Sequence, residues 1–201
     1  MLTLHVIRNR NLAMTATKLM TAEDFWMMPE APGKQFELVD GELIEMPTAG
    51  AVHNAIMVLL VTLIQAHSRQ HRLGRTFGDG LGYILRRDPD VVRIPDVSFV
   101  RQENVPESGI PISFWVGRPD LAIEIVSPHD RASAVRAKVR AYIEFGVPLV
   151  WICWPATHTI SVYAADGSLR ELGPDDVLDG EDILPGFAIR VADVFNTDDM
   201  G

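Results

Sequence analysis

The sequence predicts one α/β (α+β) domain, in which a mixed β-sheet is flanked by helices and preceded by an N-terminal hairpin. Three patterns predict this class: an Asp-Gly turn between two short strands, a long apolar helix, and a strand–helix–strand unit in the second half of the chain. The chain has 201 residues, of which 47% are hydrophobic, and this is sufficient for one buried core. Such a composition excludes a disordered chain and a small disulfide-bonded scaffold.

Composition also bears on location and partners. The single cysteine, Cys153, cannot pair within the chain, so we expect a reducing, cytoplasmic environment. The longest apolar run, residues 55–64, is shorter than the roughly 20 residues that cross a bilayer, so we expect no membrane association. The net charge is −9, but residues 166–201 hold ten acidic residues against two arginines. The rest of the chain is therefore nearly neutral and neither requires nor excludes a phosphate-bearing partner.

We expect three parts along the chain: an N-terminal extension (residues 1–19), a core domain (20–165), and an acidic C-terminal segment (166–201) that packs on the core or trails it. The extension carries three Lys or Arg residues, no acid and no clear periodicity. We therefore expect a loose arm, or a stretch that precedes an internal start codon. Thr21 begins a better-formed segment, because two acids follow it, as they do in the first turn of a helix.

Residues 36–46 predict a β-hairpin. Asp40 and Gly41 suit a two-residue type I′ turn, because both central positions of that turn need a positive φ. The register that this turn imposes places Glu37 opposite Ile44.

Further elements follow from periodicity. Residues 51–73 predict a long helix, since apolar side chains recur at intervals of three and four. Residues 81–86 and 91–100 predict strands on either side of a turn. Residues 160–164 and 169–172 predict a closing hairpin around an Asp-Gly turn.

The second half of the chain predicts a βαβ unit. Residues 121–126 and 149–154 are short apolar strands, and residues 130–145 between them predict a helix that ends at a glycine. A crossover of this length favours parallel pairing of the two strands.

Glu124 is the one charged residue within the apolar strand 121–126. Alternation places the leucine and isoleucines of this strand on one face and Glu124 on the other. A buried carboxylate is costly unless a positive group meets it. Two interpretations stay open: a structural salt bridge, or a metal ligand or catalytic acid.

Lys138 is one of three lysines in a chain whose other 15 basic residues are arginines. It shares the apolar stripe of its helix with Val135 and Tyr142, whereas Arg136 and Arg140 lie on the opposite face. From that stripe Lys138 can reach the Glu124 carboxylate, although a lysine there could also extend its ammonium group into solvent.

Asp96 lies near the start of a predicted strand, where an aspartate is often only a turn residue. Together with Glu124 and Lys138 it suggests a different role, because two carboxylates with open coordination suit Mg²⁺, whereas zinc prefers His or Cys ligands. The six histidines show no metal-binding spacing, and no glycine-rich phosphate loop is present.

Several segments resemble a known family, the Uma family of restriction endonucleases within the PD-(D/E)XK nuclease superfamily, over about residues 20–165. They are Phe-Glu-Leu-Val-Asp-Gly-Glu-Leu at 36–43, His53, Pro-Asp-Val at 95–97, Pro-Asp-Leu-Ala-Ile-Glu-Ile-Val-Ser-Pro at 119–128, the stretch from Lys138 through Tyr142 to Gly146 and Val147, and Val150-Trp151. The resemblance implies a restriction-endonuclease-like core with a mixed sheet, Mg²⁺ as cofactor, DNA as substrate and a homodimer.

The resemblance also implies roles for single residues. Asp96 and Glu124 correspond to the two acidic metal ligands, and Glu37 corresponds to an upstream acid that supports the metal directly or through water. The usual superfamily pattern places a lysine two residues after the second acid, where this chain has Val126. Lys138 on the following helix is therefore the candidate lysine. The expected catalytic set is Glu37, Asp96, Glu124 and Lys138.

Two further residues are candidates for supporting roles. His53, at the start of the long helix, could contact a phosphate or support the metal ligands, or could be an ordinary polar residue at a helix start. Asp120 lies on the same strand face as Glu124 and is a candidate for support behind the ligands. The arginines at 131, 136 and 140 could bind a nucleic-acid backbone, or could simply form a solvated helix face.

The leading hypothesis is a Mg²⁺-dependent endonuclease that hydrolyses phosphodiester bonds of DNA, with Mn²⁺ as a substitute metal. The alternative is a catalytically weak or inactive nucleic-acid-binding or regulatory module on the same fold, which the acidic balance of the chain favours. A third interpretation is a structural dimerisation protein, with an interface formed by the helix 51–73 and by Trp151 and Trp154. The simplest interpretation of the tryptophan-rich strand is that it belongs to the core.

Overall fold

The computed structural model describes residues 19–29 and 31–197, so the predictions for residues 1–18 lie outside the described residues. The helices and strands are, in chain order, α1 (Ala22–Trp26), β1 (Gln35–Val39), β2 (Glu42–Met46), α2 (Ala51–His71), β3 (Gly74–Phe77), β4 (Tyr83–Arg86), β5 (Val91–Arg93), β6 (Val97–Arg101), the 3₁₀ helix η1 (Gln102–Asn104), β7 (Trp115–Val116), β8 (Leu121–Ile125), α3 (Ala132–Glu144), β9 (Leu149–Trp154), β10 (Thr159–Ala164), β11 (Leu169–Leu172), β12 (Val177–Gly180), β13 (Leu184–Arg190) and α4 (Val191–Phe195).

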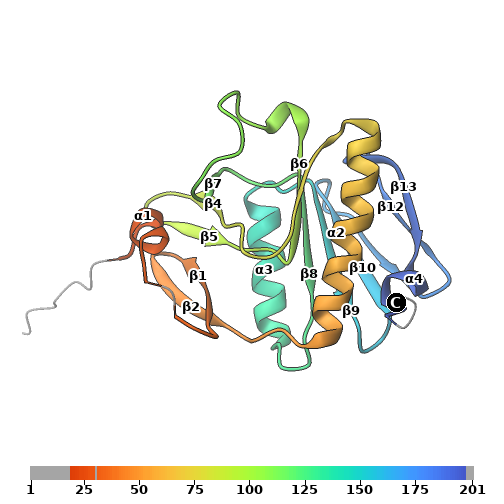
Figure 1. The fold of residues 1–201 in the computed structure, drawn as a ribbon. Helices are drawn as coiled ribbons and strands as arrows, with labels where there is room; N and C mark the ends of the chain where they lie inside the picture. Colours follow the sequence, from red (N-terminus) through yellow and green to blue (C-terminus); the bar gives the residue numbers. More distant parts are fainter. Residues whose placement is uncertain (1–18, 30, 198–201) are drawn as a thin grey trace, which may run out of the picture.

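The strands form two main sheets. One has five strands in the order β2-β1-β5-β4-β7, the other has six in the order β11-β10-β9-β8-β6-β3, and β12 and β13 pair separately. Figure 1 shows α2 and α3 on opposite faces of the six-stranded sheet, with the five-stranded sheet beside it. The predicted mixed α+β class with flanking helices is confirmed.

The N-terminal hairpin has the predicted register. Glu37 pairs with Ile44, and Leu38 with Leu43. Asp40 and Gly41 have φ values of 54° and 77°, as a type I′ turn requires, and aspartate and glycine tolerate this region best. The side chain of Glu37 is thereby fixed on the face of β1 that turns inward, where it is 1% exposed.

The prediction of one strand over residues 91–100 is wrong. The structure has two strands there, β5 in the five-stranded sheet and β6 in the six-stranded sheet. Pro95 explains the break, because proline has no N–H to donate and interrupts a ladder of backbone hydrogen bonds. The chain crosses from one sheet to the other at residues 94–96, and Asp96 lies at this crossing.

The predicted βαβ unit is present as β8, α3 and β9. The two strands are parallel, with Glu124 opposite Ile152. On one face of β8, Ile123 and Ile125 pack with residues of α2, whereas Ala122 on the other face packs with residues of α3. Glu124 therefore lies on the α3 side of the sheet, as the alternation predicted.

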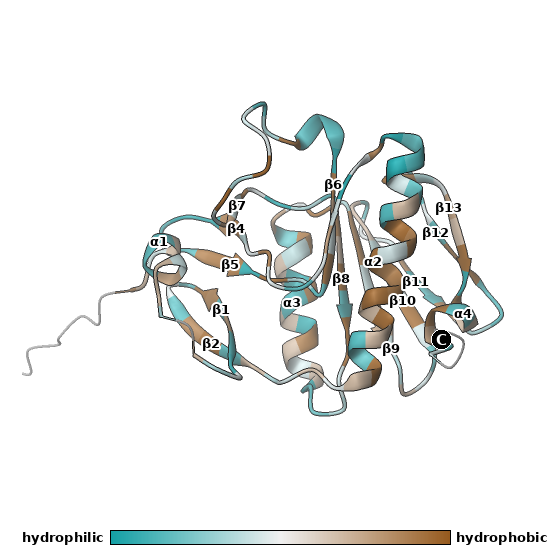
Figure 2. Ribbon diagram, viewed as in Figure 1, coloured by the Kyte–Doolittle hydropathy of each residue, from teal (hydrophilic) through white to brown (hydrophobic). Residues whose placement is uncertain are grey.

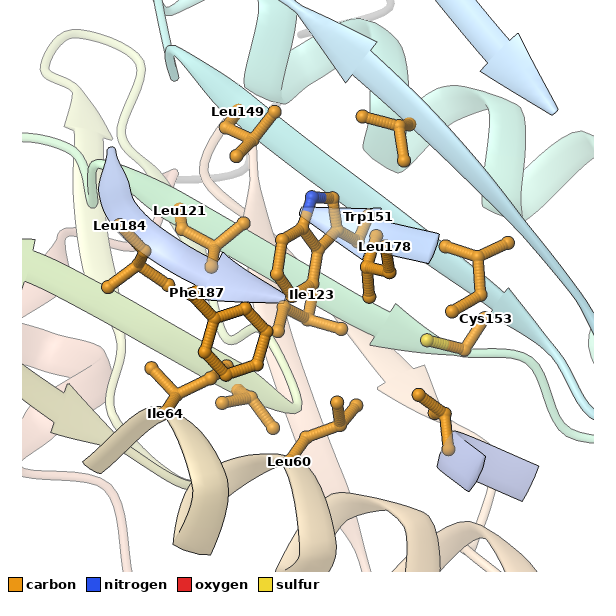
Figure 3. Packing of buried hydrophobic residues seen from close by; sticks show 14 of the residues in the cluster. Leu60, Ile64, Leu121, Ile123, Leu149, Trp151, Cys153, Leu178, Leu184 and Phe187 are labelled. Atoms are coloured by element: carbon orange, nitrogen blue, oxygen red, sulfur yellow. The ribbon is translucent and has the colours of Figure 1, made fainter. Parts of the chain in front are cut away.

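The main hydrophobic core lies between the six-stranded sheet and α2. Figure 3 shows Trp151 at its centre, with Leu60 from α2 and Leu178, Leu184 and Phe187 from the C-terminal segment around it. Between residues 172 and 195 the acidic segment thus supplies buried apolar residues to the core. Figure 2 shows the central strands of this sheet as mainly hydrophobic.

Helix α2 is long and apolar enough to cross a membrane by length and composition alone, a property that core helices of soluble proteins share. The expectation of no membrane association rested on the apolar run of residues 55–64, which is shorter than the whole of α2. In the structure Ile56, Leu60 and Ile64 are fully buried against the sheet. The apolar character of α2 is accounted for in part by this packing.

Replacing Leu178 by alanine is expected to destabilise the domain by about 2–5 kcal/mol, the cost of an unfilled core cavity. Leu178 is 0% exposed and lies in the main core cluster. The neighbouring Val177 is 50% exposed, so Val177→Ala is the control and should change stability by less than about 0.5 kcal/mol. Urea unfolding followed by circular dichroism measures both. Equal stability of the two variants would show that the C-terminal segment does not contribute to the core.

Candidate active site

Five of the six candidate residues line one pocket of about 460 Å³. Glu37 comes from β1 of the five-stranded sheet, Glu124 from β8 of the six-stranded sheet, His53 from α2 and Lys138 from α3, while Asp96 lies where the chain crosses between the sheets. The pocket therefore lies where the two sheets and the two long helices meet. Residues that are far apart in the sequence face one cavity.

The Lys138 ammonium group joins two buried carboxylates. Its Nζ atom donates to Glu124 Oε2 at 2.7 Å and lies 3.4 Å from Glu37 Oε1. The side chains of Lys138 and Glu124 are 13% and 8% exposed, so this ion pair is largely withdrawn from water. This contact is the salt bridge that one interpretation of Glu124 expected. It is also the approach of Lys138 to Glu124 that the apolar stripe of the helix predicted.

Two residues that the sequence interpretation did not assign to the site hold these carboxylates. The Tyr142 hydroxyl donates to Glu124 Oε1 at 2.6 Å, and Arg93 donates to Glu37 Oε2 at 2.7 Å. Tyr142 lies one helical turn after Lys138, and this spacing was a usable signal for its position. Arg93 is a charged residue in an apolar strand, but its partner is 56 positions away in the sequence.

The charges in the pocket perturb one another. Burial raises the pKa of Glu124 to about 7; Lys138 opposes this rise, while Asp96 and Glu37 add to it. Burial alone would lower the pKa of Lys138, but the negative charges of Glu124, Glu37 and Asp96 outweigh it and raise that pKa. Lys138 therefore stays charged at neutral pH, and a further cation near Glu124 would relieve its repulsion from the other carboxylates.

Asp96 is fixed by the end of β8 and by α2. Its Oδ2 atom accepts a hydrogen bond from the backbone N–H of Ile125 at 2.6 Å and lies 3.1 Å from His53 Nε2. Burial lowers the pKa of His53, but the hydrogen bond and the charge of Asp96 outweigh that effect and raise it. Among residues 19–29 and 31–197, no hydrogen bond is made to Asp96 Oδ1, so this oxygen is free for a ligand in the pocket.

The imidazole of His53 does not offer a free edge to a phosphate. Nε2 is engaged by Asp96, and Nδ1 is buried without a hydrogen-bond partner in the part of the chain that the structure describes. The geometry gives His53 a contact that orients Asp96, and not the phosphate contact that the sequence suggested as one option.

Asp120 lies apart from this pocket, so its expected support of the metal ligands is wrong. Its carboxylate accepts from the backbone N–H of Arg101 at 2.8 Å and from the side-chain amide of Asn104 at 2.9 Å. It shares a face with Glu124, but four residues of extended strand separate the two by roughly 13 Å. Asp120 instead ties the loop after β6 to the start of β8.

The donor chemistry of the pocket fits a hard divalent cation, but only as a two-carboxylate site. Within the described ranges, no group of three His, Cys, Asp or Glu side chains is arranged to hold a metal ion. Asp96 has a free oxygen, and each Glu124 oxygen accepts one hydrogen bond from a side chain although a carboxylate oxygen can accept two. Glu37 is more fully engaged, by Arg93, by the Ile94 N–H at 3.0 Å and by Lys138.

Replacing Tyr142 by phenylalanine is expected to cost about 1–3 kcal/mol of stability, because it leaves a buried Glu124 oxygen without a donor. The ring itself is fully buried and should keep its packing in the variant. Tyr163, whose side chain is partly exposed, provides the control, since Tyr163→Phe should change stability by less than about 0.5 kcal/mol. Thermal unfolding of both variants checks the prediction, and an unchanged Tyr142→Phe variant would contradict the proposed bond.

Comparisons with known proteins agree with this architecture. The model of the Uma2 family, described as "Putative restriction endonuclease", matches residues 22–192, which extends past residue 165 into the C-terminal segment. A crystal structure from Anabaena variabilis, described as a "putative nuclease" of the DUF820 family, has 23% sequence identity and a TM-score of 0.78, and the match covers 89% of this chain and 98% of that one. No curated protein matches the chain. Because the family match spans most of the sequence, the chain belongs to the Uma2 family.

Proposed function

We propose that this protein is a divalent-metal-dependent endonuclease that hydrolyses phosphodiester bonds of DNA, with Mg²⁺ as the metal and Mn²⁺ as a substitute. Family membership supports a restriction-endonuclease-like nuclease. The observation that carries the proposal is the meeting of Glu37, Asp96, Glu124 and Lys138, from four separate parts of the chain, in one pocket. In such a pocket the carboxylates of Asp96 and Glu124 can hold a cation, and the buried ammonium group of Lys138 can hold a phosphate beside it.

Asp96 and Glu124 are the residues that would hold the metal. Asp96 offers a free oxygen that the Ile125 N–H and His53 keep in place, and Glu124 offers the remaining lone pairs of a carboxylate oriented by Tyr142. When bound, a divalent cation lowers the pKa of a coordinated water and neutralises charge that develops on the phosphate. Glu37 would support the metal indirectly and not as a ligand, because its oxygens are already engaged by Arg93, Ile94 and Lys138.

Lys138 would act on the phosphate and on the attacking water. Its ammonium group stays protonated, and it can form three hydrogen bonds, of which Glu124 takes one and Glu37 lies near a second. The remaining donor would orient the water or stabilise the negative charge that grows on the phosphate oxygens in the transition state. Arg93 would hold the Glu37 carboxylate in place, and Glu37 in turn would keep the lysine ammonium group in the pocket.

The experiment is a cleavage assay of the purified protein on plasmid DNA, single-stranded DNA and RNA, with Mg²⁺, with Mn²⁺, and with EDTA. We expect cleavage of DNA with either metal and none with EDTA. Cleavage that persists in EDTA would contradict metal dependence, and cleavage of RNA alone would contradict the DNA substrate. No cleavage of any substrate would contradict the nuclease proposal.

A second candidate function is a catalytically weak nucleic-acid-binding module on the same fold. The observation that favours it is the direct contact of Lys138 with Glu124, together with the lack of a three-ligand metal group among the described residues. Metal titration separates the two functions, because a binding-only module need not hold Mg²⁺ between Asp96 and Glu124. The homodimer and the cytoplasmic location stay predictions, and gel filtration tests the first of them.

A further inference from the structure

We propose that the pocket that holds Asp96, Glu124 and Lys138 also binds one unstacked nucleobase of the DNA strand, against an apolar wall beside these residues. This inference rests on the proposed function and adds a base-binding site to it. It predicts a preference for DNA whose bases are unpaired. Three features of the structure support it: the size of the pocket, the apolar side chains of one wall, and a polar pair at the rim.

The pocket is larger than the proposed chemistry requires. Its volume is about 460 Å³, whereas one molecule of liquid water takes about 30 Å³. A divalent cation, an attacking water and one phosphate group therefore fill only a minor part of it. Pockets of this size in proteins bind small organic molecules. The remaining space suits the part of a nucleotide that is attached to the phosphate.

The pocket has two walls because it passes around the ends of β1 and β5. Glu37 lies on one face of β1, and alternation places Phe36 on the other. The antiparallel register of β1 and β5 brings Phe36 opposite Ile94, and both residues line the pocket. The backbone N–H of Ile94 donates to Glu37 Oε1 at 3.0 Å, so the apolar wall begins directly beside the Glu37 carboxylate.

The apolar wall consists of aromatic and aliphatic side chains that are held in place from behind. Met28, Phe36 and Ile94 are partly exposed and line the pocket. Phe25 and Phe114 are buried with their ring centroids 5.1 Å apart, and they belong to the hydrophobic cluster on which this wall rests. A base in a duplex has both faces covered by its neighbours, so only an unstacked base can place a face on such a wall.

A polar pair at the rim favours a base over a second phosphate in this part of the pocket. Gln35 Nε2 donates to Asp79 Oδ2 at 2.6 Å, and both residues are exposed and line the pocket. Among the residues that the structure describes, no hydrogen bond is made to Gln35 Oε1 or Asp79 Oδ1. These two acceptors can bind N–H groups on the edge of a base, whereas the negative charge of Asp79 repels a phosphate. Lys34, a positive residue that also lines the pocket, is paired with Glu45 at 2.8 Å.

The test compares model substrates that share a p-nitrophenyl leaving group and differ in the second ester. Methyl p-nitrophenyl phosphate carries no base, whereas thymidine 5′-(p-nitrophenyl phosphate) and its 3′ isomer carry one. With Mn²⁺, we expect the wild-type protein to hydrolyse at least one thymidine ester with a kcat/KM about tenfold or more above that of the methyl ester, the gain that stacking of one base supplies. Equal kcat/KM values for the three esters would overturn the inference.

Ala31→Trp is expected to fill the base site. Ala31 lines the pocket in the loop between α1 and β1. The variant should lose the preference for the thymidine ester and hydrolyse the methyl ester at the wild-type rate. Ala156→Trp is the control and should keep the preference, because Ala156 is exposed in the turn between β9 and β10 and does not line the pocket. A folded Ala31→Trp protein that keeps the full preference would contradict the base site.

Two further measurements do not depend on the folding of Ala31→Trp. Phe36→Leu keeps an apolar side chain but removes the aromatic face, so it should reduce the preference for the thymidine ester by about threefold or more. The wild-type protein should cleave a 30-nucleotide single strand about tenfold faster than the duplex of the same sequence, because unstacking a base in the duplex costs free energy. Cleavage of the duplex at an equal or higher rate would overturn the inference.

The proposed function is judged separately, on whether any diester is hydrolysed. Hydrolysis of all three esters with equal kcat/KM would reject the base site and keep the nuclease. If no ester and no DNA is hydrolysed, the nuclease is rejected, and calorimetric titration with thymidine 5′-monophosphate and with deoxyribose 5-phosphate judges the base site. Tighter binding of the nucleotide by the wild type, lost in Ala31→Trp, would keep the base site, and equal or absent binding of the two ligands would reject it.

Discussion

Asp96→Asn and Glu124→Gln are each expected to lose at least about 100-fold in metal-dependent DNA cleavage. Both changes keep the size of the side chain and remove the negative charge that a divalent cation requires. The amide oxygen that Asp96→Asn introduces could still accept from the Ile125 N–H, and the one that Glu124→Gln introduces could still accept from Tyr142. The loss should therefore reflect chemistry at the pocket and not loss of the fold.

Initial rates on supercoiled plasmid at saturating Mn²⁺ measure this effect. Circular dichroism and thermal unfolding show whether each variant is folded. Glu107→Gln serves as the matched control, because Glu107 is exposed in the loop before β7 and does not line the pocket that contains Asp96 and Glu124. Variants that cleave as fast as the wild type would show that the activity comes from another site or from a contaminant.

Lys138→Met is expected to destabilise the protein by about 3–5 kcal/mol, because it leaves Glu124 and Glu37 buried without the cation that joins them. The methionine keeps the length and apolar stem of lysine, so packing loss contributes little. The effect should grow as pH rises. Without Lys138 the pKa of Glu124 would rise further above its value of about 7, and the folded protein would keep a proton that the unfolded chain has released.

Urea unfolding at pH 6 and pH 8 checks both the size and the pH trend. Adding Glu124→Gln to Lys138→Met should restore part of the lost stability, because it removes the buried charge of Glu124, whereas Glu37 keeps Arg93 as its partner. Arg140→Met provides the control for loss of a positive charge on the exposed face of α3, with an expected change below about 0.5 kcal/mol. A Lys138→Met variant as stable as the wild type at pH 8 would contradict the buried ion pair.

Local signals predicted much of the fold. The Asp-Gly turn determined the register that places Glu37, and the strand–helix–strand spacing determined the parallel pairing of β8 and β9. Alternation along β8 placed Glu124 on the α3 side, and the helical stripe placed Lys138 opposite it. Turn chemistry and side-chain periodicity act over a few residues, so a single sequence contains them.

Features that depend on distant partners escaped prediction. The strands β5 and β6 belong to different sheets because their neighbours, β1 and β8, come from other parts of the chain. Arg93 was not assigned to the site for the same reason. Asp120 was misplaced because a shared strand face gives no information about distance along the strand, and because its partners Arg101 and Asn104 lie in two other elements, β6 and η1.

The central claim is that Asp96 and Glu124 together hold a divalent cation beside Lys138. Electron paramagnetic resonance titration with Mn²⁺ tests it most directly, because bound Mn²⁺ loses the sharp signal of the free ion. The account predicts one bound Mn²⁺ per wild-type chain and in Glu107→Gln, and none at the same concentrations in Asp96→Asn or Glu124→Gln. A wild-type protein that binds no Mn²⁺, or variants that bind it equally well, would contradict the account.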